Sequence, residues 1–336
     1  MRIGIDAMGG DHAPVEEVKG AMAAREFLSP QDRIVLVGPE AELRKQLAAA
    51  RGADEFIEIR HAGQAVGMDE APVEALRTKP DSSLAVLTKM HRDGQIDAAV
   101  SAGNTGAFVA AAQMHLRRLR GVHRPGIAVV TPTFHGPVTL CDVGANVSCR
   151  PQHLHQYGVM ASLYASTVCG ISRPRVGLLS IGQEDAKGNE LVKKARDRLR
   201  DETNIHFIGN VEGRDLFAGV CDVVVCDGFV GNVVLKLMEG MGAAMLRGFI
   251  EDLRASMPEH MEAVKKAAGR IMARYDFNEY GGAPLLGVGG ICIICHGATN
   301  HVGIKNAVRA AKEFSRQRVN ESITAVLSER ERIAHG

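Results

Sequence analysis

Residues 97–107 read DAAVSAGNTGA, an apolar run that passes through small and polar residues into a helix-like segment. The run predicts a buried strand over Asp97–Ser101, and the glycines permit a tight turn into a helix over 105–120. Three other predicted strands end in the same way, at residues 6–12, 181–189 and 228–232. The carboxyl ends of parallel strands share one edge of a sheet, so we expect the four loops to form a ligand crevice there.

Strand-like and helix-like runs alternate on both sides of this stretch, which predicts an α/β fold with a mostly parallel sheet between helices. The length of 336 residues fits two domains or one large one. No linker or repeat interrupts the pattern, and we therefore treat 1–336 as a single domain. The predicted strands are 3–6, 33–38, 55–60, 97–101, 126–131, 138–142, 175–180, 204–208, 222–227 and 285–295. The predicted helices are 14–28, 40–51, 70–92, 105–120, 151–169, 189–200, 229–256, 258–274 and 299–330.

Two of these helices, 229–256 and 258–274, have apolar residues at helical spacing, and they predict a protruding helical hairpin near 229–274. The apolar stripe of each helix packs on the chain's own core or on a dimer partner, which is the interpretation we favour. The alternative is contact with a membrane interface or an acyl chain.

Composition excludes several classes of protein. Lys and Arg number 40 and Asp and Glu 39, and aromatic residues make up 4% with no Trp. The chain therefore has no overall positive charge to bind a polyanion, and it has few aromatic side chains on which the bases of a single-stranded nucleic acid could stack. Asp6 near the start argues against a signal peptide. The longest stretch free of charged side chains, 281–304, is broken by Gly and Pro284, so it does not predict a spanning helix.

The seven cysteines predict buried free thiols in a reducing cytoplasm. Cys292 and Cys295 have the spacing of a zinc knuckle, but no second pair follows, and we predict no metal site. The chain also lacks the Gly-x-Gly-x-x-Gly, Walker A, Gly-x-Ser-x-Gly and His-Glu-x-x-His motifs. The pattern is therefore typical of an α/β enzyme that binds an anion through helix N-termini.

Three residues of the loops are candidates for anion binding. Lys187 either meets a phosphate as a point charge or is an exposed surface lysine. Asn232 and Asn104 either donate amide hydrogens to a phosphate or an oxyanion, or cap helices.

Other side chains are candidates for proton handling. Asp6 and Asp227 end strands, where a carboxylate takes a proton, orients a lysine or caps a turn. His12 is a candidate general base. His296 follows a buried strand and is expected to be a structural histidine.

Read together, the loops resemble the phosphate acyltransferase family, which makes acyl phosphate from acyl–acyl carrier protein in bacterial phospholipid synthesis. The resemblance spans nearly the whole chain and implies a three-layer α/β/α sandwich similar to those of isopropylmalate dehydrogenases and phosphotransacetylases. The matching segments are DAMGGDHAP (6–14), SAGNTGA (101–107), DVGAN (142–146), GLLSIGQEDAKG (177–188), FIGNVEGRD (207–215), CDGFVGNVVLK (226–236) and GGAPLLGVGGICIICHG (281–297). Ser148 and Arg150 depart from the family's usual Asp and Lys.

The resemblance implies acyl transfer from a carrier-protein thioester to inorganic phosphate, with no metal or organic cofactor and no nucleic acid. It also implies a cytoplasmic homodimer, loosely associated with the membrane, whose product reaches a membrane-embedded glycerol-3-phosphate acyltransferase. Lys187, Asn232, Asn104, His12, Asp6 and Asp227 are then the catalytic candidates. The expected substrate-binding residues are Gly9, Gly10, Asp11, Gly103, Thr105, Gly106, Asn146, Gly188 and Gly231.

Three questions stay open from the sequence. The basic cluster Arg117, Arg118, Arg120, His123 and Arg124 either receives the acidic carrier protein or is a solvated helix end. An oxidoreductase of the isopropylmalate dehydrogenase type is one alternative function, and a non-catalytic membrane-associated scaffold is another. Acyl-chain length and the choice between carrier protein and coenzyme A are not encoded in any motif.

Overall fold

The computed structural model describes residues 1–336 apart from 51–54, 276 and 336. Its described strands form one sheet in the order β3-β2-β1-β4-β11-β10-β5-β6-β9-β7-β8. The α/β fold class is confirmed. The strands are β1 Arg2–Asp6, β2 Arg33–Gly38, β3 Ile57–His61, β4 Ala98–Ser101, β5 Gly126–Thr133, β6 Gly136–Cys141, β7 Arg175–Leu179, β8 His206–Val211, β9 Val223–Val225, β10 Ala283–Leu286 and β11 Cys292–Ile294.

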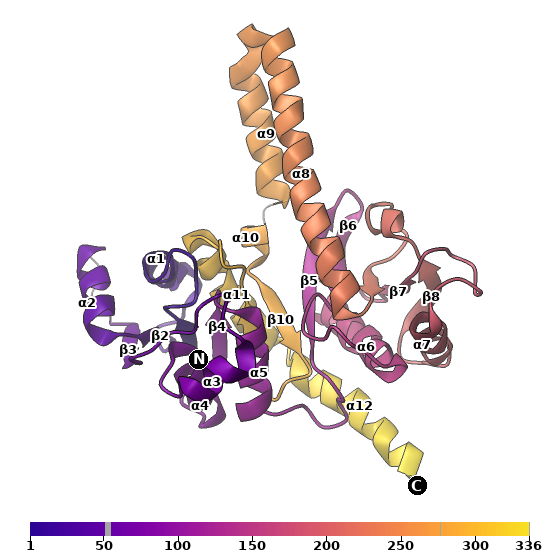
Figure 1. The fold of residues 1–336 in the computed structure, drawn as a ribbon, viewed down its shortest axis with the longest axis horizontal. Coiled ribbons are helices and arrows are strands. Elements are labelled where there is room, and N and C mark those ends of the chain that lie inside the picture. Colours follow the sequence, from indigo (N-terminus) through magenta and orange to yellow (C-terminus); the bar gives the residue numbers. More distant parts are fainter. Residues whose placement is uncertain (51–54, 276, 336) are drawn as a thin grey trace.

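Helices cover both faces of this sheet (Figure 1). Three clusters of buried apolar side chains lie between the layers, with α1 and α11, α4 and α5, and α6 and α12 as the main covering helices. The helices are α1 Val15–Ala23, α2 Glu40–Ala49, α3 Pro72–Thr78, α4 Ser83–Arg92, α5 Thr105–His115, α6 Pro151–Thr167, α7 Glu190–Arg200, α8 Gly228–Ser256, α9 Met261–Tyr275, α10 Phe277–Tyr280, α11 His301–Arg316 and α12 Val319–His335.

The predicted strand 285–295 is wrong as a single element. It contains the end of β10, a turn and β11, and the two strands are antiparallel. Gly287 has a φ of +86° inside this segment, a conformation that reverses the chain and suits glycine. A continuous apolar run hid the turn because its residues are buried on both sides.

Two predicted helices are each divided in the structure. Helix 70–92 separates into α3 and α4 because Pro80 disfavours helical backbone before it, and Ser82 then caps α4 by accepting from the Ala85 N–H. Helix 299–330 separates into α11 and α12 at Arg318, whose φ is +52°.

The sheet has two halves whose strands run in opposite directions. β3, β2, β1, β4 and β11 are parallel to one another, and so are β6, β9, β7 and β8. The strands β10 and β5 join the halves through three antiparallel pairings, so the second half runs opposite to the first. The expectation that all four loops share one edge is therefore wrong: two loops follow each half.

The register nevertheless brings both sets of loops to one junction. Ser101, at the end of β4, pairs with Ile294, which pairs with Ala283 at the start of β10. Cys141, at the end of β6, pairs with Ala128, one residue from the pairing of Ile127 with Leu285. The carboxyl ends of the two halves thus meet at nearly the same level of β10 from opposite directions.

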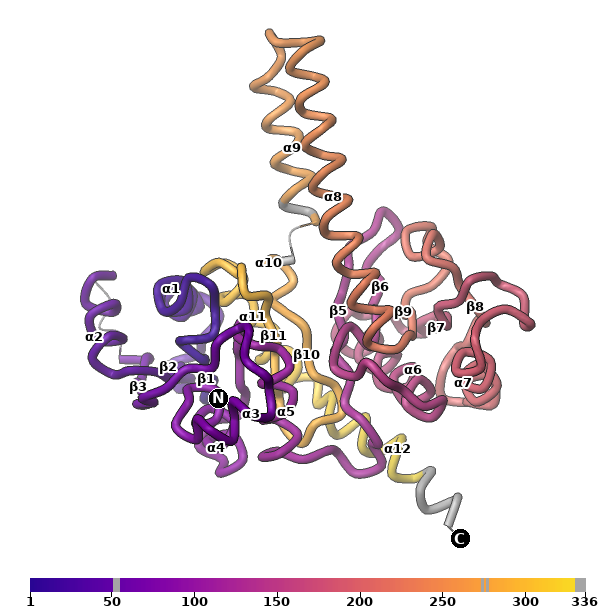
Figure 2. The backbone as a smooth tube through the Cα atoms, in the orientation of Figure 1, coloured from indigo at the N-terminus to yellow at the C-terminus, as the bar shows by residue number. Residues whose placement is uncertain are grey.

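The predicted helical hairpin is present, and it projects from the body as α8 and α9 (Figure 2). The four side chains Leu237, Met241, Met245 and Phe249, each four residues from the next, are exposed by 56–64%. Val234 and Met238 at the start of the stripe pack on the chain's own core, whereas these four side chains do not. By length and composition alone α8 could cross a membrane, with a mean hydropathy of 1.3. The sequence analysis considered only the uncharged stretch 281–304 as a possible membrane-spanning segment, and α8 lies outside that stretch.

Candidate functional site

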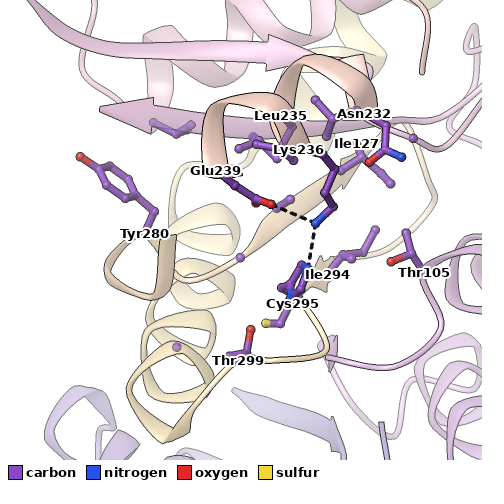
Figure 3. A pocket seen from close by; sticks show the side chains of 18 of the residues that line it. Thr105, Ile127, Asn232, Leu235, Lys236, Glu239, Tyr280, Ile294, Cys295 and Thr299 are labelled. Atoms are coloured by element: carbon purple, nitrogen blue, oxygen red, sulfur yellow. Dashed lines mark hydrogen bonds and ion pairs between the residues drawn. The ribbon is translucent and has the colours of Figure 1, made fainter. Parts of the chain in front are cut away.

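A cavity of about 290 Å³ lies at the junction of the two halves (Figure 3). Thr105 and Gly106, the first residues of α5, come from the first half, whereas Asn232, Lys236 and α8 come from the second. Residues of β5, β10 and β11 form the floor between them. The cavity exists because α8 leaves the end of β9 and runs back past the carboxyl ends of β4 and β11.

One ionic cluster faces this cavity. Lys236 Nζ lies 3.0 Å from Glu239 Oε2 and 2.8 Å from His296 Nε2. Lys236 and Glu239 belong to α8, and His296 follows β11. His296 is exposed and lines the cavity, and the expectation of a structural histidine stays a prediction.

Much of the rest of the lining is apolar. Ile127, Val129 and Val130 of β5 face the cavity, as do Leu235 of α8 and Ala283 of β10. An apolar wall beside a cationic cluster suits a ligand with a hydrocarbon part and an anionic or polar head.

The sequence analysis found three of the lining residues, Thr105, Gly106 and Asn232. It missed Lys236, Glu239 and His296. The sequence did contain a signal for Lys236, because it lies four residues after Asn232 and therefore on the same face of a helix. No sequence signal brings His296 to Lys236, since the pairing depends on how the two halves meet.

Two candidates serve as helix caps. Asn104 Oδ1 accepts from the Ala107 N–H, and Asn104 Nδ2 donates to the carbonyls of Gly67, Met68 and Glu70. Asp227 Oδ1 accepts from the first two N–H groups available in α8. Both side chains have the capping role that the sequence analysis weighed against chemistry.

Asp6 lies buried beneath the cavity-side loops of the first half. Its Oδ2 accepts from the Ser101 hydroxyl at 2.8 Å, and burial raises the pKa of its carboxyl. A Cβ on Gly9 would lie 2.6 Å from Asp6 Oδ2 and 2.7 Å from Gly103 N. The loops that contain Gly9 and Gly103 therefore pack so closely that a side chain on Gly9 would not fit.

The candidates His12, Asp11, Lys187 and Gly188 lie outside the lining of this cavity. His12 and Asp11 are exposed, and the Asp11 N–H donates to the Gly297 carbonyl at 2.8 Å. Lys187 is exposed on the loop after β7. β7 is three strands from β5, which is about 14 Å at the usual strand spacing. This distance accounts for the separation of Lys187 from the cavity.

Asn146, Gly231 and Gly10 have packing roles. Asn146 Nδ2 donates to the Pro125 carbonyl at 2.6 Å and to Tyr157 Oη at 2.8 Å. A Cβ on Gly231 would meet the Asp142 carbonyl, so only glycine fits against that loop. Gly10 lies against the carboxyl of Glu17 in the same way.

No group of three or more His, Cys, Asp or Glu side chains suited to a metal ion occurs within the described residues. Burial raises the pKa of the Cys292 and Cys295 thiols to about 12, so both are neutral near pH 7. Neutral buried thiols are poor zinc ligands.

The fold and the cavity define an α/β enzyme with an anion-compatible site between two halves of one sheet. Solved structures with a similar fold include a phosphotransacetylase from Streptococcus pyogenes (17% identity, TM-score 0.64, 94% of each chain covered). Another is the EutD phosphotransacetylase from Staphylococcus aureus (14% identity, TM-score 0.61, 93% of this chain and 94% of that chain).

The sequence comparisons are more specific. The family model described as "Fatty acid synthesis protein" matches residues 1–322. A phosphate acyltransferase from Heliobacterium modesticaldum is 50% identical over 98% of this chain and 97% of its own length. The corresponding protein of Desulforamulus reducens is 48% identical over 94% of each chain. The chain belongs to the phosphate acyltransferase family, and it is an acyltransferase of lipid synthesis. These findings favour neither the oxidoreductase nor the scaffold alternative.

Proposed function

We propose that this chain transfers the acyl group of an acyl–acyl carrier protein thioester to inorganic phosphate. The observation that supports this most directly is the cavity at the junction, which Lys236 and the N-terminus of α5 line together with apolar side chains of β5 and β10. The acyl phosphate product would then feed the acylation of glycerol 3-phosphate.

The chain's own residues would act by binding and orientation. Phosphate is already a nucleophile, so no side chain needs to be acylated. The N-terminus of α5 at Thr105 offers partial positive charge to the phosphate. Asn232, which lines the cavity, would donate to the oxygen of the thioester as its negative charge develops. Holding the two reactants in one cavity removes much of the entropic barrier.

Lys187 enters this proposal as a second cation. It lies on the loop after β7, and β7 is parallel to β9, from which α8 begins. A flexible lysine there would attract phosphate toward the junction as a point charge. His12, on the loop after β1, is proposed as a proton acceptor from the other half.

We propose a cytoplasmic homodimer that meets the membrane surface peripherally. The exposed stripe Leu237, Met241, Met245 and Phe249 supports this, because a soluble chain rarely leaves such a row uncovered. A second copy of the hairpin would cover the row, and its tip would remain able to contact lipid.

The acidic carrier protein would dock on basic residues. Burial and the charges of Arg124, His123 and Arg150 lower the pKa of His153 to about 4. The Arg150 N–H also donates to His153 Nδ1 at 3.1 Å. Arg150 thus joins the cluster predicted from residues 117–124. Asn146 links this cluster to the cavity, since its Nδ2 donates to the Pro125 carbonyl and Gly144 lines the cavity.

The test is incubation of the purified chain with palmitoyl–acyl carrier protein and phosphate, followed by trapping of acyl phosphate with hydroxylamine. Acyl hydroxamate should form only when phosphate is present. Absence of product with the carrier-protein thioester, while palmitoyl–coenzyme A is used, would limit the proposal to another donor. Absence with both would refute it.

A further inference from the structure

The second half of the sheet contributes three segments to the cavity. β5 supplies Ile127, the loop after β6 supplies Gly144, and α8 supplies Asn232. Asp142 is fully buried and contacts all three segments, although it does not itself line the cavity. The proposed reaction so far gives this carboxyl group no role.

The Asp142 carboxylate is held by backbone and amide donors. Oδ1 accepts from the N–H groups of Ile127, Gly144 and Ala145 at 3.0, 3.2 and 3.0 Å. Oδ2 accepts from the N–H and from Nδ2 of Asn146 at 2.8 and 3.2 Å. Burial raises the pKa of the carboxyl, whereas these donors favour its ionised form. The N–H groups of the loop are therefore used within the chain and are not free to bind a ligand.

The first turn of α8 packs directly on Asp142. A Cβ on Gly231 would collide with the Asp142 carbonyl oxygen, and a Cβ on Gly228 would lie 2.7 Å from Oδ2. The Cys226 thiol donates to the same carbonyl at 3.4 Å. The two glycines thus allow α8 to begin against Asp142.

Asn232 follows Gly231 in α8, and its side chain lies beside Gly144. A Cβ on Gly144 would lie 3.8 Å from Cβ and Cγ of Asn232 and 3.9 Å from its Oδ1. Gly144 has a φ of +130°, which suits glycine, and its N–H donates to Asp142. Asp142 therefore supports the Asn232 amide from two sides, through Gly144 and through Gly231.

We propose that Asp142 is a positioning residue that sets where the Asn232 amide lies in the cavity. This inference rests on the proposed function, in which Asn232 donates to the thioester oxygen. Such a donor stabilises the developing negative charge only if it is already in place when the charge appears. A displacement of about 1 Å can cost about 10²-fold in rate. Asp142 should therefore affect kcat without touching the substrate.

Two substitutions disturb this support in different ways. Asp142→Asn removes the charge and one acceptor oxygen, whereas Gly231→Ala pushes α8 away from the Asp142 carbonyl. With palmitoyl–acyl carrier protein, each should lower kcat about tenfold or more. The KM for phosphate should change less than about threefold, because Thr105 belongs to the other half. Gly240→Ala is the matched control: the same change in the same helix meets open space, and it should behave as wild type.

A double-mutant cycle with Asn232→Ala separates positioning from general damage to the fold. If Asp142 acts through Asn232, removal of the amide leaves nothing to misplace. Asp142→Asn combined with Asn232→Ala should then have the kcat of Asn232→Ala alone, within about twofold. Asp222→Asn breaks bonds to Arg175 at the other end of β9, and it should leave kcat unchanged in both backgrounds.

Losses that multiply in the cycle would overturn the positioning role, and so would a wild-type kcat for Asn232→Ala. Melting temperatures show which variants fold. Gly231→Ala with Asn232→Ala repeats the cycle without changing the carboxylate, so either Asp142→Asn or Gly231→Ala is sufficient. If the wild type forms no acyl phosphate, the proposed function itself fails, which is a different result from an active wild type with multiplying losses.

Discussion

At the residue scale, Asn104 shows how a residue predicted to bind a ligand has a structural role instead. Asn104 uses its oxygen to cap α5 and both amide hydrogens to hold the loop at 67–70. Spacing alone could not distinguish this from a ligand donor, because the three carbonyls come from a segment more than 30 residues away.

Asn104→Ala is therefore expected to destabilise the fold by about 1–3 kcal/mol, because the helix cap is lost and three carbonyls lose their hydrogen-bond donor. Urea denaturation measures this change. Asn189→Ala removes the exposed cap of α7 and should cost about 1 kcal/mol, since only one hydrogen bond is lost. Equal costs for the two variants would contradict the additional role of Asn104.

Lys187→Ala should raise the KM for phosphate about tenfold or more without lowering the melting temperature, because Lys187 is exposed and makes no packing contact with the core. Steady-state kinetics with varied phosphate measure it, with Lys194→Ala as control. Unchanged phosphate dependence would remove Lys187 from the site and leave Lys236 as its cation.

Two adjacent glutamates of α1 should respond to pH in opposite ways. Burial, with help from the Asp6 carboxyl, raises the pKa of Glu17 to about 7. Burial also acts on Glu16, but hydrogen bonds from His301 outweigh it and lower the pKa to about 2. The folded chain thus binds a proton at Glu17 that the unfolded chain releases above about 4.5, so this residue's contribution to stability falls as pH rises from 4.5 to 7.

Glu17→Gln should accordingly increase the free energy of unfolding above pH 7, by up to a few kcal/mol, and flatten its dependence on pH between 5 and 7. Glu16→Gln should lower that free energy at pH 7 and have little effect below pH 2. Urea denaturation checks both, across pH 5–8 for Glu17→Gln and at pH 7 and pH 2 for Glu16→Gln. A loss of stability for Glu17→Gln at pH 8 would show that its carboxylate is stabilising instead.

At the element scale, the sequence predicted most strands to within two residues, because apolar runs between turn residues mark buried strands well. It failed where the run continued through a turn, as in 285–295, and where a polar residue began a second helix, as at Ser82. The hairpin was found because its apolar residues repeat over two long helices, but periodicity cannot say what covers them.

The stripe of α8 gives a prediction about assembly. Met241→Glu with Met245→Glu should convert the proposed dimer to a monomer, because two charges would be buried between the hairpins. Light scattering with size exclusion measures the mass, and circular dichroism checks the fold. Arg247→Glu, on an exposed position of the same helix, is the control. If the double variant stays dimeric but no longer floats with anionic vesicles, the stripe contacts lipid instead of a second copy.

At the scale of the whole molecule, the site arises from the reversal of strand direction between β10 and β5. A chain of parallel βαβ units would place every carboxyl-end loop on one edge, which is what the alternation of elements predicts. The two strands β10 and β5, with three antiparallel pairings, are enough to turn the second half around. Their register then decides which side chains share the cavity, so Thr105 and Asn232 both line it, while Lys187 follows β7, three strands from β5.

A cavity built from both halves should couple their stability. Phosphate at 100 times its Kd should raise the free energy of unfolding by about 2.7 kcal/mol, because it binds only where the halves meet. Thermal unfolding with and without phosphate measures this, and sulfate at equal ionic strength controls for salt. One cooperative transition that moves as a whole is expected, and Lys236→Met should abolish most of the shift. Two separate transitions, of which only one moves, would place the phosphate within a single half and contradict a shared site.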